Sequence, residues 1–148
     1  MTAEDWDEAD DEKWCAERRE EVREYLARQP QKFGEVGEWP EWYVAPYVSI
    51  WAVGSIARPG DTGWWVICGD LPTDYASAKD VFTPREAAAA FAKRWHTLSG
   101  LMRKGERHPD MTIGTPLDAA ELAPLLKARA KTLADWARDD SLWNGSPP

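Results

Sequence analysis

Two segments rich in β-forming residues flank a turn in the middle of the chain. Residues 43–57 alternate between an aliphatic and an aromatic face, which is the period-two pattern of a strand. Residues 64–69 are apolar on both faces, as in a strand covered on both sides. Because the intervening residues 58–63 (RPGDTG) favour a turn, the pattern predicts a long antiparallel hairpin. Pro46 cannot donate a ladder hydrogen bond and therefore marks an edge, a bulge or a strand start.

Helices are predicted on both sides of this hairpin. Residues 4–28 show a helical period, and a second helix begins at the capping sequence of residues 83–86 (TPRE) and runs to about Leu98. A third helix is expected from residue 115, with an apolar stripe made of Leu122, Leu125, Leu126, Leu133 and Trp136. A short third strand is expected at residues 80–82. The predicted class is α+β, with a small antiparallel sheet packed by about three helices.

The length of 148 residues predicts a single domain over residues 1–148, with flexible ends at 1–12 and 139–148. No apolar run approaches the roughly 20 residues of a membrane span, and the N-terminus is acidic where a signal peptide is basic. We therefore expect a cytoplasmic protein without membrane association. Cys15 and Cys68 are then two ordinary reduced thiols, since their spacing matches no metal site.

The negative charge is concentrated in the first part of the chain. Residues 1–28 hold eleven acids and five bases, and residues 29–82 hold seven acids and three bases, whereas the whole chain has a net charge of −8. Such a surface repels phosphate, which argues against a nucleic-acid binder and favours a basic protein partner. The alternative is that the acidity only keeps the protein soluble.

An acidic loop is expected after the second strand, over residues 70–77. Asp70, Asp74 and Tyr75 follow a strand end, and the hairpin topology suggests that Glu35 and Glu38 approach them. Carboxylates in such a place can act as acid, base or binding groups. The alternative is that Asp70 and Asp74 only hold the loop by bonding backbone N–H groups. No catalytic, metal-binding or cofactor-binding motif is present, so we assign no catalytic residue, metal or cofactor.

Five aromatic residues of the same region are candidates for a binding surface. They are Trp39, Trp42, Tyr47, Trp51 and Trp65. An aromatic floor rimmed by acids suits a cationic ligand or the Arg and Lys side chains of a partner. The alternative is that a helix of the protein itself covers this face.

The residues 34–53 (GEVGEWPEWYVAPYVSIWAV) and 63–75 (GWWVICGDLPTDY) resemble a family of short bacterial proteins known only as a domain of unknown function. The resemblance extends weakly through residues 83–95 and does not cover the chain beyond Gly100. It implies a bacterial cytoplasmic origin, and it brings neither an activity nor a catalytic residue.

Three functions are compatible with these patterns. The first is a non-enzymatic acidic binding protein, such as an immunity- or inhibitor-like partner of another protein. The second is a small-molecule-binding domain or an enzyme with an acidic site at Asp70 and Asp74. The third is an accessory domain that acts as a homodimer through an exposed strand edge or aromatic face.

Overall fold

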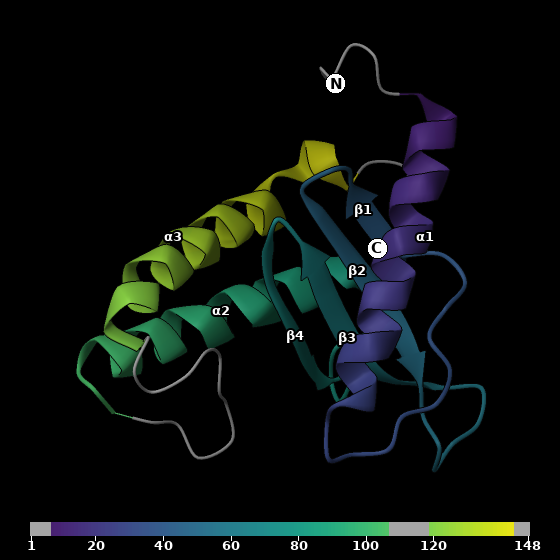
Figure 1. Cartoon of the computed structure of the whole chain (residues 1–148), viewed down its shortest axis with the longest axis horizontal. Helices are drawn as coiled ribbons and strands as arrows, with labels where there is room; N and C mark the ends of the chain where they lie inside the picture. Colours follow the sequence, from purple (N-terminus) through teal and green to yellow (C-terminus); the bar gives the residue numbers. More distant parts are fainter. Residues whose placement is uncertain (1–6, 107–118, 144–148) are drawn as a thin grey trace. The chain divides into compact units, whose positions relative to one another are not determined.

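The computed structural model describes residues 7–106 and 119–143 (Figure 1). The chain divides into two compact units, Met1–Pro84 and Arg85–Pro148, which are called unit 1 and unit 2 below. The single domain and the flexible ends expected from the sequence stay predictions. Residues 1–6 and 144–148 of those ends, and the expected helix start at residue 115, lie outside the described residues.

Unit 1 contains a four-stranded antiparallel sheet in the order β1-β2-β3-β4. The strands are β1 (Trp42–Val44), β2 (Val48–Gly54), β3 (Thr62–Gly69) and β4 (Leu71–Ser77). The predicted hairpin is confirmed as β2 and β3, which pair with Trp51 opposite Val66. The sheet therefore grows by short connections between neighbouring strands, as local antiparallel pairing favours.

The prediction of one long strand over residues 43–57 is wrong. The chain turns after Val44 and resumes as β2 at Val48, and the turn contains a cis peptide bond between Ala45 and Pro46. The Tyr47 N–H donates to the Val44 carbonyl at 2.8 Å. Proline has no N–H to offer to a ladder, so the strand is interrupted there and β1 pairs back onto β2.

The prediction of a loop at residues 70–77 is also wrong, because most of this segment is β4. Gly69 has a φ of 141°, which favours glycine and lets the chain reverse at Asp70. The reversal gives the outer backbone edge of β3 a partner, and Pro72 is tolerated because β4 is an edge strand. Residues 80–82 form no strand, since the Val81 N–H closes a turn onto the Ala78 carbonyl at 3.0 Å.

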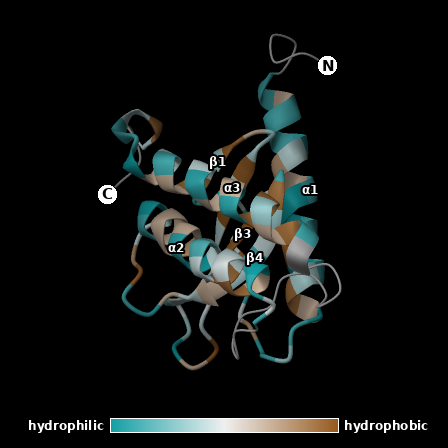
Figure 2. Ribbon diagram, turned by 90° about the vertical axis from the view of Figure 1, so that its left-hand side faces the viewer, coloured by the Kyte–Doolittle hydropathy of each residue, from teal (hydrophilic) through white to brown (hydrophobic). Residues whose placement is uncertain are grey.

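One helix, α1 (Glu8–Ala27), packs on one face of the sheet. Its N-terminus is a capping box in which the side chains of Asp7 and Asp10 each accept a hydrogen bond from the other's backbone N–H at 3.0 Å. Val22 and Leu26 pack against the β2 and β3 side chains Trp51, Val53, Val66 and Cys68. The rest of α1 is mostly hydrophilic, as its teal colour in Figure 2 shows, so this helix contributes a narrow apolar face to the core.

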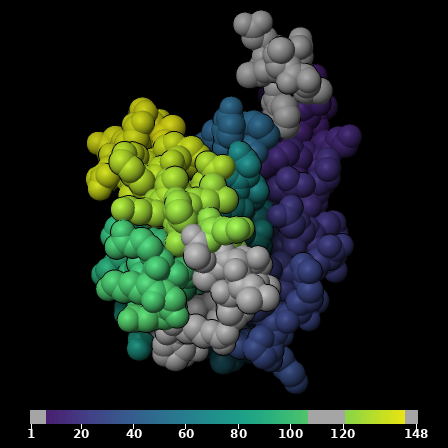
Figure 3. Space-filling view, turned by 60° about the vertical axis from the view of Figure 1, so that its left-hand side comes forward, coloured from purple at the N-terminus to yellow at the C-terminus, as the bar shows by residue number. Residues whose placement is uncertain are grey.

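Unit 2 consists of two helices followed by a short turn of helix. They are α2 (Pro84–Arg103), α3 (Ala119–Arg138) and the 3-10 helix η2 (Asp140–Leu142). The start of α2 is predicted correctly, but the helix continues through Gly100 instead of ending near Leu98. In Figure 3, α2 (green) and α3 (yellow-green) lie side by side. With these helices the predicted α+β class is confirmed.

The apolar stripe of α3 differs from the predicted one. Leu126 and Leu133 are buried as expected, but Leu125 is 51% exposed. Alanines supply the other buried positions, namely Ala123, Ala130 and Ala137. The predicted stripe included only large apolar residues, but alanines at the same helical spacing are buried to a similar extent. None of the helices within the described residues combines the length and the apolar character of a membrane span.

Candidate functional site

The acidic residues predicted to converge lie at different ends of the sheet. The Gly54 N–H, at the end of β2, donates to the Glu35 carbonyl at 2.9 Å. The Asp70 N–H donates to the Tyr47 carbonyl at 2.8 Å, next to the start of β2. Because a seven-residue strand is about 20 Å long, β2 separates Glu35 from Asp70. These two residues therefore do not form one site.

Asp74 and Tyr75 are separated by the pleat of β4. Asp74 lies opposite Ile67, is 4% exposed, and its Oδ1 accepts a hydrogen bond from the Tyr75 N–H at 2.9 Å. Tyr75 lies opposite Val66 on the α1 side, where its ring meets Phe33 at 5.4 Å. A pocket of about 590 Å³ in unit 1 is lined in part by Glu35. The residues that were expected to share a site with Glu35 do not line it; they are Glu38, Asp70, Asp74 and Tyr75.

The predicted aromatic floor is not formed either. Trp51 is fully buried in the core beneath α1, and Trp65 lies on the opposite face of the sheet. Trp42 shares that opposite face, since it pairs with Ile50, and is 6% exposed. The Trp65 indole donates to the Val81 carbonyl at 2.9 Å. These three tryptophans are structural residues rather than parts of one binding surface.

Trp39 and Tyr47 are the two predicted aromatic residues with large exposed surfaces, at 45% and 51%. The Trp39 ring meets the Tyr43 ring edge-on, with centroids 5.9 Å apart and an interplanar angle of 85°. Tyr43 in turn packs on Trp14 of α1, at 6.3 Å between centroids. Since edge-to-face pairs of this kind are favourable, Trp39 is held in place although nearly half of it faces solvent.

A hydrogen bond anchors this aromatic cluster to α1. The Tyr43 hydroxyl donates to Oδ2 of Asp11 at 2.9 Å. The pKa of Tyr43 is raised to about 12, first by burial of the phenol and then by the hydrogen bond to Asp11 and the negative charge of that carboxylate. Tyr43 is therefore a neutral donor at physiological pH, and the position of its ring is fixed.

The backbone that carries Trp39 is also fixed. The Gly37 N–H donates to the Ala52 carbonyl at 3.0 Å, and the Glu41 N–H donates to the Ile50 carbonyl at 2.8 Å. From the α1 side, Nε of Arg19 donates to the Gly37 carbonyl at 2.9 Å. The segment that bears Trp39 thus has a defined conformation.

Together these residues form what we call the edge surface, beside the outer strand β1. It comprises Asp11, Glu38, Trp39, Glu41 and Tyr43, and it rests on the buried ring of Trp14. Glu38 and Glu41 are exposed on either side of Trp39, and the charge of Glu8 acts on Tyr43. An exposed indole among carboxylates can receive a guanidinium or ammonium group by cation–π attraction and ion pairing.

The sequence patterns did not predict Asp11 and Tyr43 as members of this surface. Both residues fall within predicted elements, Asp11 in the helix over residues 4–28 and Tyr43 at the start of the segment 43–57, while Trp14 is a buried core residue. A signal was present, because Asp11 lies three residues before Trp14 and the two must share one side of a helix. Nothing in the sequence, however, brings that side of the helix onto Tyr43.

The described part of the chain contains no cluster of metal ligands, and its two thiols are not activated. Across residues 7–106 and 119–143, no three His, Cys, Asp or Glu side chains come together in a way that could hold a metal ion. Cys15 and Cys68 are both buried, and burial raises the pKa of each thiol to about 11. Both are therefore protonated at neutral pH and poorly nucleophilic.

Comparison with known proteins identifies a family. No curated protein and no solved structure matches this chain. A family model does match, over residues 8–143, and so covers both units and nearly the whole sequence. The resemblance to a domain of unknown function is thereby confirmed, but its expected limit at Gly100 is wrong: over residues 8–143 the chain belongs to the family described as Domain of unknown function (DUF4826).

Proposed function

We propose that the protein is a non-enzymatic binding protein that uses the edge surface of unit 1 to hold a basic segment of a protein partner. The observation that carries this proposal is Trp39, an indole exposed by 45% yet held edge-on against Tyr43. Exposed tryptophans held in a fixed conformation are typical anchors of protein interfaces. An immunity- or inhibitor-like role is the kind of function that such a module serves.

The charge of unit 1 supports a basic partner. Residues 1–84 hold eighteen acids and eight bases, a net charge of −10. A field of this sign steers a positively charged surface toward the edge surface and raises its association rate. Arg and Lys side chains would then lie over Trp39, between the carboxylates of Glu38 and Glu41.

The alternative function, a small-molecule site or an enzyme at Asp70 and Asp74, has less support. The Asp70 backbone is bonded beside Tyr47, while Asp74 lies buried within β4. Neither the 590 Å³ pocket of unit 1 nor the 800 Å³ groove of unit 2 is lined by two of the predicted acids. The proposal includes a bacterial cytoplasmic setting, which the two free buried thiols support.

Affinity capture from host lysate tests this function with four forms of the protein. They are the wild type, Trp39→Ala, the charge reversal Glu38→Lys, and Ile56→Ala as a control. Ile56 is a suitable control because it is 57% exposed but follows the far end of β2. Capture is compared at about 0.1 M and about 1 M salt, where the screening length falls from roughly 10 Å to roughly 3 Å.

We expect the wild type and Ile56→Ala to capture one protein from the lysate. Trp39→Ala and Glu38→Lys should not capture it. Retention should fall at the higher salt concentration. Equal retention by the wild type and Trp39→Ala would contradict the proposal. Size-exclusion chromatography of the purified protein tests whether the partner is a second copy of this chain. It is a second copy if the wild type elutes as a dimer and Trp39→Ala elutes as a monomer.

A further inference from the structure

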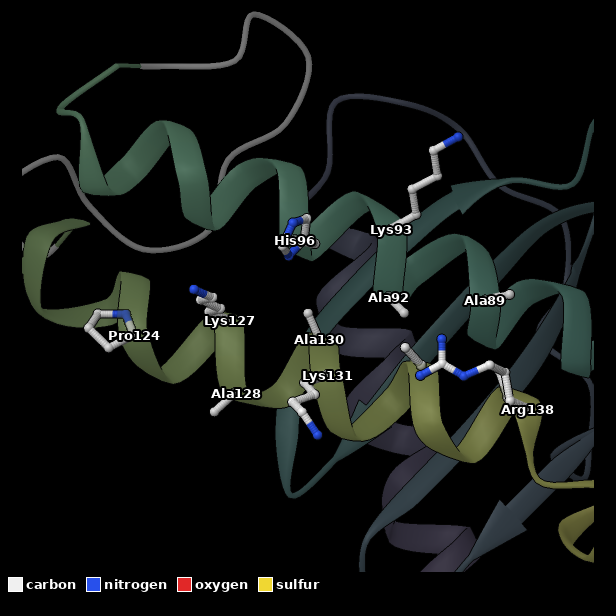
Figure 4. Close-up of a pocket in the computed structure, with 12 residues that line it drawn as sticks. Ala89, Ala92, Lys93, His96, Pro124, Lys127, Ala128, Ala130, Lys131 and Arg138 are labelled. Carbon is white, nitrogen blue, oxygen red and sulfur yellow. The ribbon is translucent and has the colours of Figure 1, made fainter.

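Unit 2 contains a surface groove of about 800 Å³ that the edge surface does not involve. It is lined by residues of α2 and α3 only, as Figure 4 shows. Its volume lies within the range of about 300–1,000 Å³ that is usual for small-molecule sites. None of the residues that line the groove belongs to the edge surface.

The floor of the groove consists of alanine side chains. Ala92 of α2 and Ala130 and Ala137 of α3 are buried, and Ala134 is half-buried beside them. The methyl side chains are short, and the open space of the groove lies above them. The lining there is apolar and offers an aliphatic chain a surface that carries no competing polar group.

The rim of the groove is cationic. Lys93 and His96 come from α2, and Lys127, Lys131 and Arg138 come from α3. Among the described residues that line the groove, none is acidic. In Figure 4, His96 and Lys127 project into the space between the helices from its two sides. The groove thus joins an apolar floor to a positive rim.

Some of these cations are already compensated and others are not. Lys131 and Arg138 both pair with Asp135, at 3.2 Å and 2.7 Å. Within the described residues, Lys93 and Lys127 have no ion-pair partner. An anionic group held by Lys127 would therefore gain attraction without breaking an existing pair.

From this combination we infer that the groove binds a single-chain amphiphile with an anionic head group. The aliphatic chain lies on the alanine floor, and the head group, a carboxylate or a phosphate, lies at the rim beside Lys127. Both head groups carry the charge that the rim selects, and their relative affinities show which of them the groove prefers. Binding is expected to be reversible, with no covalent step.

Calorimetric titration of the full-length protein tests the inference with four monomeric probes of equal chain length. They are decanoate, decyl phosphate, decanol and decyltrimethylammonium. The two anions should bind, and the uncharged and cationic probes should bind at least about tenfold more weakly, because the rim contributes only to an anion. Replacing decanoate with octanoate should weaken binding by up to about fourfold for each methylene removed.

Two pairs of variants locate the site. Lys127→Glu should weaken decanoate binding by roughly tenfold, whereas Lys104→Glu, which makes the same change in net charge at an exposed position outside the groove, should change it by less than about twofold. Ala134→Phe should abolish binding by filling the groove. Thr97→Phe, at an exposed α2 position outside the lining, is its control.

Several results would overturn the inference. If decanol binds as tightly as decanoate, the cationic rim does not contribute to binding. If Ala134→Phe binds decanoate as tightly as the wild type does, the ligand does not occupy the groove. Absence of measurable heat with both anions would show that the groove takes no such ligand. Circular dichroism of each variant establishes that it is folded before its titration is interpreted.

Discussion

The indole N–H of Trp51 donates a hydrogen bond to the hydroxyl of Ser49, two residues earlier on the same strand, at 2.9 Å. The Ser49 hydroxyl also lies 3.1 Å from the Cys68 carbonyl and 3.3 Å from the Cys68 sulfur on the neighbouring strand. Both Ser49 and Trp51 are fully buried. This small network satisfies the polar atoms of the largest side chain in the core beneath α1.

Replacing Ser49 with alanine should leave the Trp51 N–H without its partner inside the core. A buried donor that loses its acceptor costs about 1–3 kcal/mol, so the free energy of unfolding should fall by that amount in urea denaturation. Ser55→Ala is the control, because Ser55 accepts a single hydrogen bond from the Arg58 N–H in an exposed turn. If both variants lose the same small amount, Trp51 does not depend on Ser49.

Gly34→Ala should destabilise unit 1. A Cβ atom at this position would lie 2.5 Å from the Gly54 carbonyl oxygen, a backbone atom that cannot move aside without breaking the local pairing. Overpacking of this kind costs about 1–3 kcal/mol, measurable as a lower midpoint in urea.

Gly100→Ala should have the opposite effect. Gly100 lies inside α2, and an added Cβ there meets no atom within 4 Å. Alanine is the better helix former by about 0.8–1 kcal/mol, so the free energy of unfolding should rise. A loss of stability in Gly100→Ala would mean that this turn of α2 is not formed in solution.

Stability should decrease in alkaline solution. Burial raises the pKa of Cys68 and of Cys15 from 9.0 to about 11, so the folded state favours the neutral thiols more than the unfolded state does. This contribution is fully present below about pH 9 and is lost as the pH rises from 9 to 11. Urea denaturation across this range should show a falling free energy of unfolding.

A variant with both Cys15→Ala and Cys68→Ala isolates the thiol contribution. Its baseline stability will be lower, but the decline between pH 9 and 11 should become clearly shallower. An equally steep decline in the variant would assign the effect to other groups. In the wild type, a thiol reagent at pH 8 should react only at the rate of unfolding, since both sulfurs are buried.

Arg85 fastens the C-terminal turn of unit 2. Its Nε donates to the Ala137 carbonyl at 2.7 Å, and its Nη2 pairs with Asp140 at 2.6 Å. Arg85→Met should therefore loosen η2 and raise the hydrogen-exchange rates of the amides from 139 to 143. Arg138→Met, which removes only an exposed pair with Asp135, should leave these rates unchanged.

The sequence by itself determined the kinds of element and the class of the fold. The alternation in residues 48–54, the capping sequence before α2 and the helical period of α1 each depend on local backbone geometry, which neighbouring residues specify. The acidity of residues 1–84 and the family resemblance were also visible without a structure. The prediction failed where Pro46 divides a strand and where polar residues form β4, because pairing with an existing edge overrides local preference.

Only the tertiary structure decided which residues meet. Trp51 and Trp65 lie on opposite faces because of the register of β2 on β3, and a shift by one residue would exchange those faces. Glu35 and Asp70 were placed at opposite ends of β2 by backbone hydrogen bonds that no local pattern encodes. Asp11, Tyr43 and Trp39 came together only when α1 packed on the sheet. The chemical character of each segment follows from its own residues. Which residues lie close together depends on packing between elements that are far apart in the sequence.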